Sequence, residues 1–525
     1  MASVRRHLAD LSRRGLLRGA TGLAGLAALG PAFSTRAESR LPGGMTSEPF
    51  RLGVAAGDPQ PDGFVIWTRL APDPLAPDGG MPPAPVEVAW EVAEDPAFRS
   101  IAAAGQALAR PEWAHSLHVE VTGLRPQRPY FYRFRLHGEA SPTGHARTAP
   151  LPTADADFRM VTAGCQHYEH GFFTAWRHIA QEEVDLVFHY GDFIYEYAGR
   201  PIGAVSSGRS TVRSHAGGET FGLADYRTRY AQYRLDPDLA AASAAHAFAV
   251  TFDDHEVANN WTGDVGGRGE TGPDFDLRKA AAFQAWYEHM PVRRSALPQG
   301  PRITAHRRLH FGRNLALHLL DTRGARDDQP CGDGTKPPCA EVARAEAQML
   351  GAAQEAWLLD GAAARPATWQ VLAQQVPMFA RTFPNGAIGM DKWDGYPAAR
   401  TRLLHGLHQR GATNLVVLSG DVHSAYAATV AAEPEGPALA CEFTATSISS
   451  EGDGSEQRRG SAALLAANPH IAFHNNRRGY TLQHFTGRHC FATFRALPFV
   501  SSPGAPVEDR ARFVVAAGDV ALHPA

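Results

Sequence analysis

The heptapeptide HYGDFIY occupies residues 189–195 and directly follows the apolar run VDLVF at residues 184–188. The apolar run predicts a buried strand. Gly191 lets the backbone turn sharply, so Asp192 comes to the strand's carboxyl end, with Tyr195 three residues later. A carboxylate and a phenol at one turn could ligate a hard, highly charged metal ion. Taken alone, the same pattern would also suit a turn aspartate and a core tyrosine.

Four more apolar runs end at polar side chains of the same kind. The runs cover residues 158–163, 247–252, 315–320 and 414–418. The polar residues that follow them include Cys165, Asp253, Asp254, His255, Asp321, Arg323, Asp421 and His423. Ligands of α/β sheets bind outside the carboxyl ends of the strands. Five such strand ends therefore predict one shared site, whereas the Asp253–Asp254 pair alone could be a helix cap.

The residue types at these strand ends are those of a multi-metal centre. Asp192 has two carboxylate oxygens and could bridge two ions. The thiolate of Cys165 and the phenolate of Tyr195 are anionic ligands that together favour Fe(III), and His423 can ligate through one ring nitrogen. Oxygen donors that suit calcium, magnesium or manganese are Asp253, Asp254, Asn259, Asn260 and Asp421. Such metals would lower the pKa of a bound water and neutralise a phosphate, which predicts hydrolysis of phosphate esters.

Two further side chains are candidates for contact with the substrate. Arg323 offers a planar fork of donors for phosphate, and His255 could protonate a leaving alkoxide. The alternative for Arg323 is a structural ion pair with Asp321 that braces the loop. We predict Arg323, His255 and Asp192 as the catalytic residues.

The length and composition suit a globular protein of more than one domain. The chain has 525 residues, of which 44% are hydrophobic and 20% charged. The formal net charge of −3 offers no electrostatic case for binding nucleic acid.

Two kinds of pattern divide the chain. Alternating apolar and polar residues occur at 64–69, 86–92, 117–121 and 130–136, with turn residues between them. They predict an N-terminal β-sandwich of immunoglobulin or fibronectin-III type over residues 48–150. Strands then alternate with helices expected at 172–183, 277–290 and 342–359, which predicts an α/β domain over residues 155–525. Residues 199–222 show little periodicity and are expected to form a long surface loop, with a lid over the site as a further interpretation.

The N-terminus carries the features of an export signal. A twin-arginine pattern, SRRGLLR, covers residues 12–18, and a mild apolar stretch and a small-residue site at residues 35–37 follow. Residues 1–37 are therefore predicted to be a cleaved Tat signal peptide, which implies the Tat translocon as a partner and a periplasmic or secreted location. A Sec signal or a membrane anchor is the alternative. No other stretch is apolar for long enough to be a transmembrane segment.

Five cysteines in an exported chain leave one unpaired. Cys331 and Cys339 flank a loop rich in glycine and proline, and a disulfide between them is plausible. Cys441 and Cys490 could form a second disulfide. Cys165 remains at a strand end, as a metal ligand or as a buried free thiol.

With these residues assembled, the chain resembles the PhoD-type alkaline phosphatases and phosphodiesterases, a branch of the metallophosphoesterases near the purple acid phosphatases. The resemblance runs from about residue 50 to near the C-terminus. It rests on ordered segments such as GVAAGDP at 53–59, GDFIYE at 191–196, DDHE at 253–256, LDTR at 320–323, WDGYP at 393–397 and SGDVHS at 419–424. It implies a metallophosphoesterase fold of two sheets flanked by helices behind an Ig-like domain, with Fe(3+) and Ca(2+) as cofactors.

By motif position, the resemblance implies a set of ligands for each metal. The iron ligands would be Cys165, Asp192, Tyr195 and His423. The calcium ligands would be Asp192, Asp254 and Asp421, with contributions from Asp253 and Asn260. Asp421 stands where related metallophosphoesterases carry a histidine, and Cys165 where they carry an aspartate; both changes occur in the PhoD branch.

The predicted function is that of a secreted, metal-dependent alkaline phosphatase that hydrolyses small phosphate monoesters, with diesters as a further substrate class. One alternative is a phosphodiesterase of the phospholipase D type. Another is a non-catalytic exported binding protein that has kept the fold. The complete ligand set argues against the binding protein, because loss of Asp192 or Arg323 would be expected in such a chain.

Overall fold

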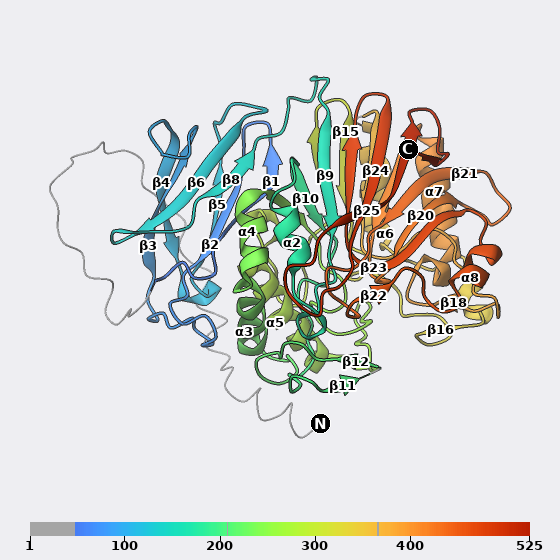
Figure 1. Cartoon of the computed structure of the whole chain (residues 1–525), viewed down its shortest axis with the longest axis horizontal. Coiled ribbons are helices and arrows are strands. Elements are labelled where there is room, and N and C mark those ends of the chain that lie inside the picture. Colours follow the sequence, from blue (N-terminus) through green and yellow to red (C-terminus); the bar gives the residue numbers. More distant parts are fainter. Residues whose placement is uncertain (1–47, 207, 365–366) are drawn as a thin grey trace.

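The structure is a computed structural model that describes residues 48–206, 208–364 and 367–525 (Figure 1). The predicted export signal at residues 1–37 lies outside these residues. The N-terminal strands lie at one side of the molecule and the C-terminal elements at the other (Figure 1). Within the described part, no helix is both long and apolar enough to cross a membrane.

The N-terminal segment forms two sheets that face each other. The first consists of β3 (Val86–Ala93), β4 (Ile101–Ala109), β6 (Pro129–Leu136), β7 (Glu139–Ala140) and β8 (Gly144–Arg147). The second consists of β1 (Val54–Gln60), β2 (Gly63–Arg69) and β5 (Ser116–Val121). Phe64 of β2 packs against Tyr130 and Tyr132 of β6, with ring centroids 6.3 Å apart in both pairs. Since β1 also pairs in parallel with β13 (Ala247–Val250), this second sheet continues without a break into the rest of the molecule.

The sheet that β1 joins carries three of the predicted strands, β9, β10 and β13. The parallel strands β9 (Phe158–Ala163) and β10 (Leu186–His189) lie beside β13. On the other side of β9 follow the antiparallel strands β23 (Ile471–Phe485), β24 (His489–Leu497), β25 (Glu508–Ala516) and β26 (His523–Pro524). We call this continuous sheet, which runs from β5 and β2 through β1, β13, β10 and β9 to β26, the first sheet. It is distinct from the five-stranded N-terminal sheet of β3, β4, β6, β7 and β8.

A second sheet carries the other two predicted strands, β15 and β19. Its strands are β14 (Arg307–Phe311), β15 (Leu315–Leu319), β17 (Trp369–Ala373), β19 (Leu415–Ser419), β21 (Ala438–Thr444) and β20 (Ala425–Ala431), in that order. The long strand β23 links the two sheets, because its residues 471–475 pair with β20 and its residues 481–485 pair with β9. Small hairpins complete the strands: β11 (Val205–Ser206) with β12 (Arg209–Ser210), β16 (Thr335–Lys336) with β18 (Ile388–Gly389), and β22 (Gly454–Ser455) against β23.

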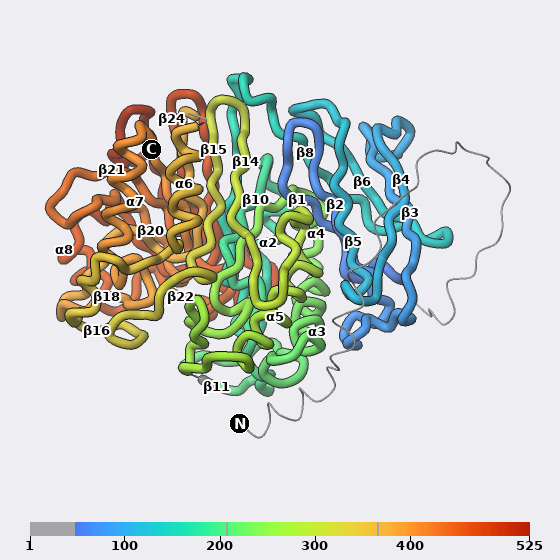
Figure 2. Tube along the Cα trace, turned by 180° about the vertical axis from the view of Figure 1, so that it is seen from behind, coloured from blue at the N-terminus to red at the C-terminus, as the bar shows by residue number. Residues whose placement is uncertain are grey.

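The two sheets pack face to face, and helices cover their outer faces. Side chains alternate along each strand, so Met160 of β9 lies in the core shared by both sheets while Val161 lies in the outer core. Across the shared core, the rings of Phe158 and Phe311 stack with centroids 3.9 Å apart. Helices α2 (Thr174–Ile179), α3 (Leu223–Arg234), α4 (Pro237–Ala245) and α5 (Pro273–His289) pack on the first sheet. Helices α6 (Ala352–Ala364), α7 (Pro397–Gln409) and α8 (Ser461–Ala467) pack on the second, and Figure 2 shows α6 and α7 from that side.

The predicted strands agree with the observed ones to within a few residues, but two predicted helices are partly wrong. The helix expected at 172–183 spans only Thr174–Ile179. The helix expected at 342–359 begins only at Ala352, and residues 340–343 form a separate 3-10 turn. Gly351 has φ of 71°, a left-handed conformation that an α-helix cannot include, and it separates the two elements. The loop expected at 199–222 contains only the short β11–β12 hairpin among its described residues.

One of the two plausible disulfides is confirmed and the other is wrong. Cys331 and Cys339 are bonded, with Cα atoms 5.9 Å apart. Cys441 and Cys490 are free and fully buried in the core between the sheets. Cys441 lies on β21 of the second sheet and Cys490 on β24 of the first, so each thiol serves as a small apolar side chain in the packed interior. Burial raises the pKa of Cys441 to about 12.

Candidate metal centre

The polar residues after five strands meet at one edge of the two sheets. Strand β10 pairs with β9 from Leu186 opposite Met160 to His189 opposite Ala163, so the two strands end side by side. The loops after them remain joined, because Cys165 N–H donates to the Gly191 carbonyl at 3.1 Å. Three sets of potential ligand atoms lie within 4.8 Å of one another in this region: Cys165 with Asp192 and His423, Asp192 with Asp254 and His255, and Asp253 with Asp254 and Asp421.

The four residues predicted for iron lie together, with Cys165 and Tyr195 on one oxygen of Asp192 and His423 beside Tyr195. The Cys165 thiol donates to Asp192 Oδ2 at 3.3 Å, and the Tyr195 hydroxyl donates to the same oxygen at 2.8 Å. His423 Nε2 lies 3.3 Å from the Tyr195 hydroxyl. The Ser450 hydroxyl lies 2.6 Å from that phenol, a contact that the sequence pattern did not indicate.

The carboxylates predicted for calcium form the neighbouring cluster. Asp253 and Asp254 follow β13 and Asp421 follows β19, so both sheets contribute. Asp192 falls in one set with Cys165 and in another with Asp254, which places it between the two clusters. Asn260 relates differently to the cluster: its backbone N–H donates to Asp254 Oδ2 at 2.7 Å, while its side-chain amide donates to Asp333 at 2.5 Å.

Several of these residues adopt an unusual backbone conformation. The φ angles are 50° at Cys165, 54° at Asp192, 54° at Asn260, 67° at Asp421 and 53° at His423. The left-handed region costs a non-glycine residue on the order of 1–3 kcal/mol and is concentrated at functional sites. Such turns at consecutive strand ends direct the side chains toward a common point.

A buried glutamate holds two of the strand-end loops in place. Glu256 accepts hydrogen bonds from the backbone N–H groups of Asp192 (3.1 Å), Phe193 (2.6 Å) and Asp253 (2.8 Å). Burial raises the pKa of Glu256 to about 7. No role for Glu256 was predicted from the sequence, although an acid three positions after Asp253 is a recognisable loop-capping pattern.

The electrostatics of the cluster fit bound cations. Burial, partly opposed by His255 and reinforced by Asp254, raises the pKa of Asp192 well above its usual range, and burial raises the pKa of Asp253 to about 8. Asp192 Oδ1 and Asp253 Oδ2 are buried without a hydrogen-bond partner among the described residues. A buried carboxylate without partners is costly, and a metal ion would offset the cost and favour the ionised form.

The thiol of Cys165 and the phenol of Tyr195 are also buried beside a carboxylate, which disfavours their ionised forms. Burial, and then the charge of Asp192, raise the pKa of Cys165 and of Tyr195 well above their ordinary values. A coordinated cation deprotonates such groups, so the donor set is chemically suited to a highly charged ion.

His255 lies beside the predicted bridge and carries its own orienting partner. Its Nδ1 is 2.7 Å from Glu196 Oε2, and its Nε2 is 3.9 Å from Asp254 Oδ2. Burial lowers the pKa of His255, but Asp254, Glu196 and Asp192 outweigh burial and hold it well above 6.5. The imidazolium can therefore donate a proton at this point of the site.

Arg323 faces the other strand ends, and its side chain does not pair with Asp321. Its Nε donates to Asp253 at 2.6 Å and its Nη1 donates to Asp391 at 2.9 Å, while its side chain is completely buried. Asp321 instead accepts the backbone N–H of Arg323 at 2.9 Å. Arg323 Nη2, which lies 3.5 Å from Asp254, is the one guanidinium nitrogen of this residue without a hydrogen bond among the described contacts.

Lys392 is a second cation that the sequence analysis missed. Its ammonium lies 3.1 Å from Asp391 Oδ2 and also forms an ion pair with Asp421. Burial lowers the pKa of Lys392, but Asp421 and Asp391 outweigh burial and keep the side chain charged. Its position directly before the WDGYP segment was the available signal.

Comparison with known proteins gives a consistent result along nearly the whole chain. The model of the family described as PhoD-like phosphatase matches residues 160–494, and that of its N-terminal domain matches residues 36–150. Alkaline phosphatase D of Bacillus subtilis (strain 168) is 45% identical over 512 residues, which cover 96% of this chain and 87% of that protein.

Solved structures agree with the sequence matches. The structure of PhoD has a TM-score of 0.88 at 44% identity and covers 91% of this chain and 92% of that chain. A purple acid phosphatase from yellow lupin (Lupinus luteus) seeds has a TM-score of 0.50 at 13% identity, covering 88% of this chain and 73% of that chain. The second likeness concerns the fold alone.

Proposed function

The chain belongs to the PhoD-like phosphatase family and is a phosphoric ester hydrolase, and on this basis we propose that it is a metal-dependent alkaline phosphatase acting on small phosphate monoesters. The observation that carries the proposal is the convergence of Cys165, Tyr195 and His423 on Asp192, beside a second cluster of carboxylates. Diesters are a second proposed substrate class. The non-catalytic binding protein is disfavoured, because the entire predicted donor set is present.

The proposed architecture is an Ig-like sandwich over residues 48–150 followed by a metallophosphoesterase domain over residues 155–525. The facing N-terminal sheets support the first part, and the two packed sheets with helices on their outer faces support the second. The shared β1–β13 pairing means that the two parts are joined through a sheet rather than through a linker alone.

The proposed cofactors are Fe(III) and Ca(II). Cys165, Asp192, Tyr195 and His423 would hold iron. Asp192, Asp254 and Asp421 would hold calcium, with Asp253 and Asn260 as contributors. When bound, the metals supply an activated water and charge neutralisation at the phosphate.

The protein's own side chains would orient and protonate the substrate. His255, charged and held by Glu196, would give its proton to the leaving oxygen. Arg323 would bind a phosphate oxygen through Nη2, while its other nitrogens hold Asp253 and Asp391. Its full burial means that it also orders the carboxylates around it.

Export by the Tat translocon, with a periplasmic or secreted product, is proposed from residues 12–18. Replacing Arg13 and Arg14 together by lysine should retain the protein in the cytoplasm. Normal secretion of that double variant would contradict the proposal.

The test of the proposed function is an assay of the purified holoenzyme combined with metal analysis. We expect hydrolysis of p-nitrophenyl phosphate, with bis(p-nitrophenyl) phosphate as the diester arm, and iron and calcium in stoichiometric amounts. Thiolate and phenolate ligands should give iron a visible absorption band that Cys165→Ala and Tyr195→Phe weaken or shift. A colourless zinc protein would contradict the iron assignment, and an inactive protein with full metal content would contradict the phosphatase assignment.

A further inference from the structure

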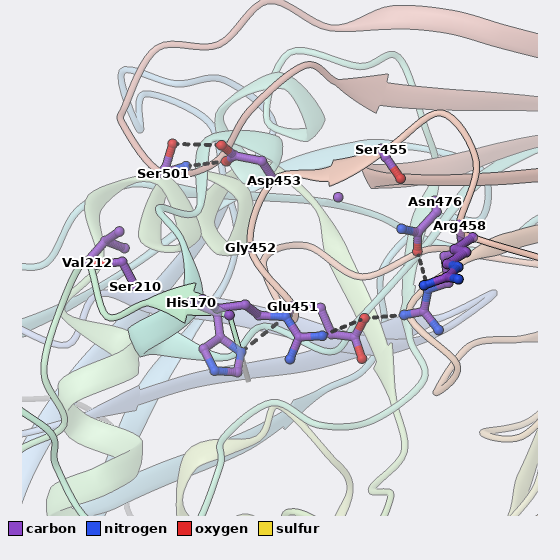
Figure 3. A pocket seen from close by; sticks show the side chains of 14 residues that line it. His170, Ser210, Val212, Glu451, Gly452, Asp453, Ser455, Arg458, Asn476 and Ser501 are labelled. Atoms are coloured by element: carbon purple, nitrogen blue, oxygen red, sulfur yellow. Dashed lines mark hydrogen bonds and ion pairs between the residues drawn. The ribbon is translucent and has the colours of Figure 1, made fainter. Parts of the chain in front are cut away.

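A polar pocket of about 630 Å³ (Figure 3) has Glu451 in its wall, and Glu451 contacts the proposed metal ligand His423. Its walls come from five separate segments: the turn that contains His170, residues 208–212 in and after the β11–β12 hairpin, the loop 451–459, β23 and the loop that contains Ser501. Three arginines line it, namely Arg209, Arg458 and Arg459. Val212 is the only apolar side chain among the described residues of the wall, so the pocket suits a charged and hydrated ligand better than an apolar one.

A single side chain, Glu451, connects the pocket to the proposed metal centre. Glu451 Oε1 in its wall lies 3.5 Å from His423 Nδ1, and the other ring nitrogen of His423 faces Tyr195. On the same wall, the backbone N–H of Glu451 donates to His170 Nδ1 at 3.2 Å. Glu451 has φ of 72°, a further left-handed non-glycine residue where the pocket meets the site.

The charges of the wall leave a positive excess. Asp453 is already engaged by the Ser501 hydroxyl at 2.9 Å and by two backbone N–H groups. Glu451 pairs with Arg209 at 3.3 Å and also with Arg458. Arg459 is exposed and has no carboxylate partner among the described contacts, so its fork of donors is available to an anion.

We propose that this arginine pocket, the cavity lined by Arg209, Glu451, Arg458 and Arg459, binds a second anionic group of the substrate. The inference rests on the proposed phosphatase function and names its preferred substrate class: phosphate esters that carry another phosphate on the leaving group. The scissile phosphate lies at the metals, and the second phosphate lies beyond His423 with Arg459 as its principal contact.

The experiment compares substrates that differ only in the second anion. Glucose 6-phosphate and glucose 1,6-bisphosphate are assayed with the holoenzyme, with p-nitrophenyl phosphate as the reference ester. We expect a higher kcat/KM for the bisphosphate, beyond the statistical advantage of its two phosphates. Arg459→Gln should lower that kcat/KM roughly 3- to 5-fold, as expected for one exposed charged contact. Arg459→Glu should lower it about tenfold or more, because it places a like charge against the anion.

The matched control is Arg488→Gln, which removes an exposed arginine from the turn between β23 and β24. This turn adjoins the start of β9, at the opposite end of the sheet from the site. Arg459 is the chosen position because Arg209 and Arg458 hold Glu451, which contacts a proposed metal ligand.

The outcomes separate this inference from the function on which it rests. Selective loss of activity toward the bisphosphate in the Arg459 variants, weakened by high salt, supports the arginine pocket. If the wild type hydrolyses p-nitrophenyl phosphate but the Arg459 variants treat both sugar phosphates as the wild type does, the pocket proposal is overturned and the proposed function stands. If no phosphate ester is hydrolysed, the proposed function itself is wrong.

Discussion

A buried glutamate accepts hydrogen bonds from the strand-end segments of each of the two sheets, and the two glutamates hold different parts of the molecule in place. Glu256, in the loop after β13 of the first sheet, accepts three backbone N–H groups, two of which belong to the proposed ligands Asp192 and Asp253. Glu442 in the second sheet accepts the backbone N–H groups of Met378 and Phe379, the latter at 2.7 Å, and the Ser419 hydroxyl at 2.5 Å.

The two glutamates have nearly the same physical state. Both are buried, and burial raises the pKa of each to about 7. The difference lies in what they hold: Glu256 fixes the backbone of proposed ligands directly, whereas Glu442 fixes neighbouring loops. Two glutamates with similar burial and similar pKa shifts therefore have different roles: Glu256 positions the proposed metal ligands, and Glu442 stabilises loops of the second sheet.

The largest effect is expected at Asp192, whose backbone N–H is held by Glu256. Asp192→Asn removes the charge that the proposed bridge shares between two ions. We expect both metals to be lost and kcat/KM to fall on the order of a thousandfold or more, while the fold persists. Metal analysis and circular dichroism check the two parts. Full metal content in the variant would mean that Asp192 is not the bridge.

Arg323 tests the connection between the sheets, since it follows β15 of the second sheet and pairs with Asp253 from the first. Arg323→Lys keeps the charge but loses the fork. We expect kcat/KM to fall by a factor on the order of 10 to 1000, or about 1.4–4 kcal/mol, with weaker inhibition by inorganic phosphate and unchanged metal content. A fall in thermal stability with normal kinetics and normal phosphate inhibition would instead indicate a purely structural arginine.

The variants Glu256→Gln and Glu442→Gln test directly whether the two glutamates differ in their effect on the metal centre. A glutamine keeps the shape but offers a single acceptor oxygen, so backbone N–H groups lose partners in both variants. Because Glu256 positions ligands, we expect its variant to lose metal affinity about 10- to 100-fold. The Glu442 variant should lose stability with a smaller change in metal affinity. Competitive titration with a chelator measures the difference, and equal losses would remove the distinction between the two glutamates.

Glu442 also contributes a dependence of stability on pH. Its folded pKa of about 7 lies above the ordinary value of 4.5. The folded state therefore binds the proton more tightly than the unfolded state. The contribution is fully present below pH 4.5 and is lost as the pH rises through 7, amounting to at most about 3 kcal/mol. Denaturant unfolding of wild type and Glu442→Gln between pH 5 and 8 should differ in slope; parallel profiles would contradict the assignment.

Much of the site was accessible from local sequence patterns. Each strand is a short apolar run, and the residue at which the run stops is visible in the sequence. The expectation that Cys165, Asp192 and Asp254 meet needed only the rule that parallel strands end at one edge. Asp421 follows β19 of the second sheet, so its place beside them also required the two sheets to pack together. Their roles as ligands are still proposals, but their proximity is now observed.

The features that escaped the sequence depend on contacts between distant segments. Glu256 and Glu442 are buried acids whose partners lie on other loops, and Lys392 reaches Asp421 from a loop outside the predicted strands. Cys441 and Cys490 were paired by counting, yet they lie on different sheets as free thiols.

Local order along the chain was thus sufficient for the strands, the ends that carry the chemistry and the family resemblance, because side-chain alternation and turn residues act over a few neighbours. The tertiary arrangement of strands and loops settled which buried acids hold which loops, which cysteines stay free and where Glu451 and the three arginines enclose a pocket. Those outcomes depend on burial and on hydrogen bonds and ion pairs between segments tens to hundreds of residues apart, and no local pattern encodes either.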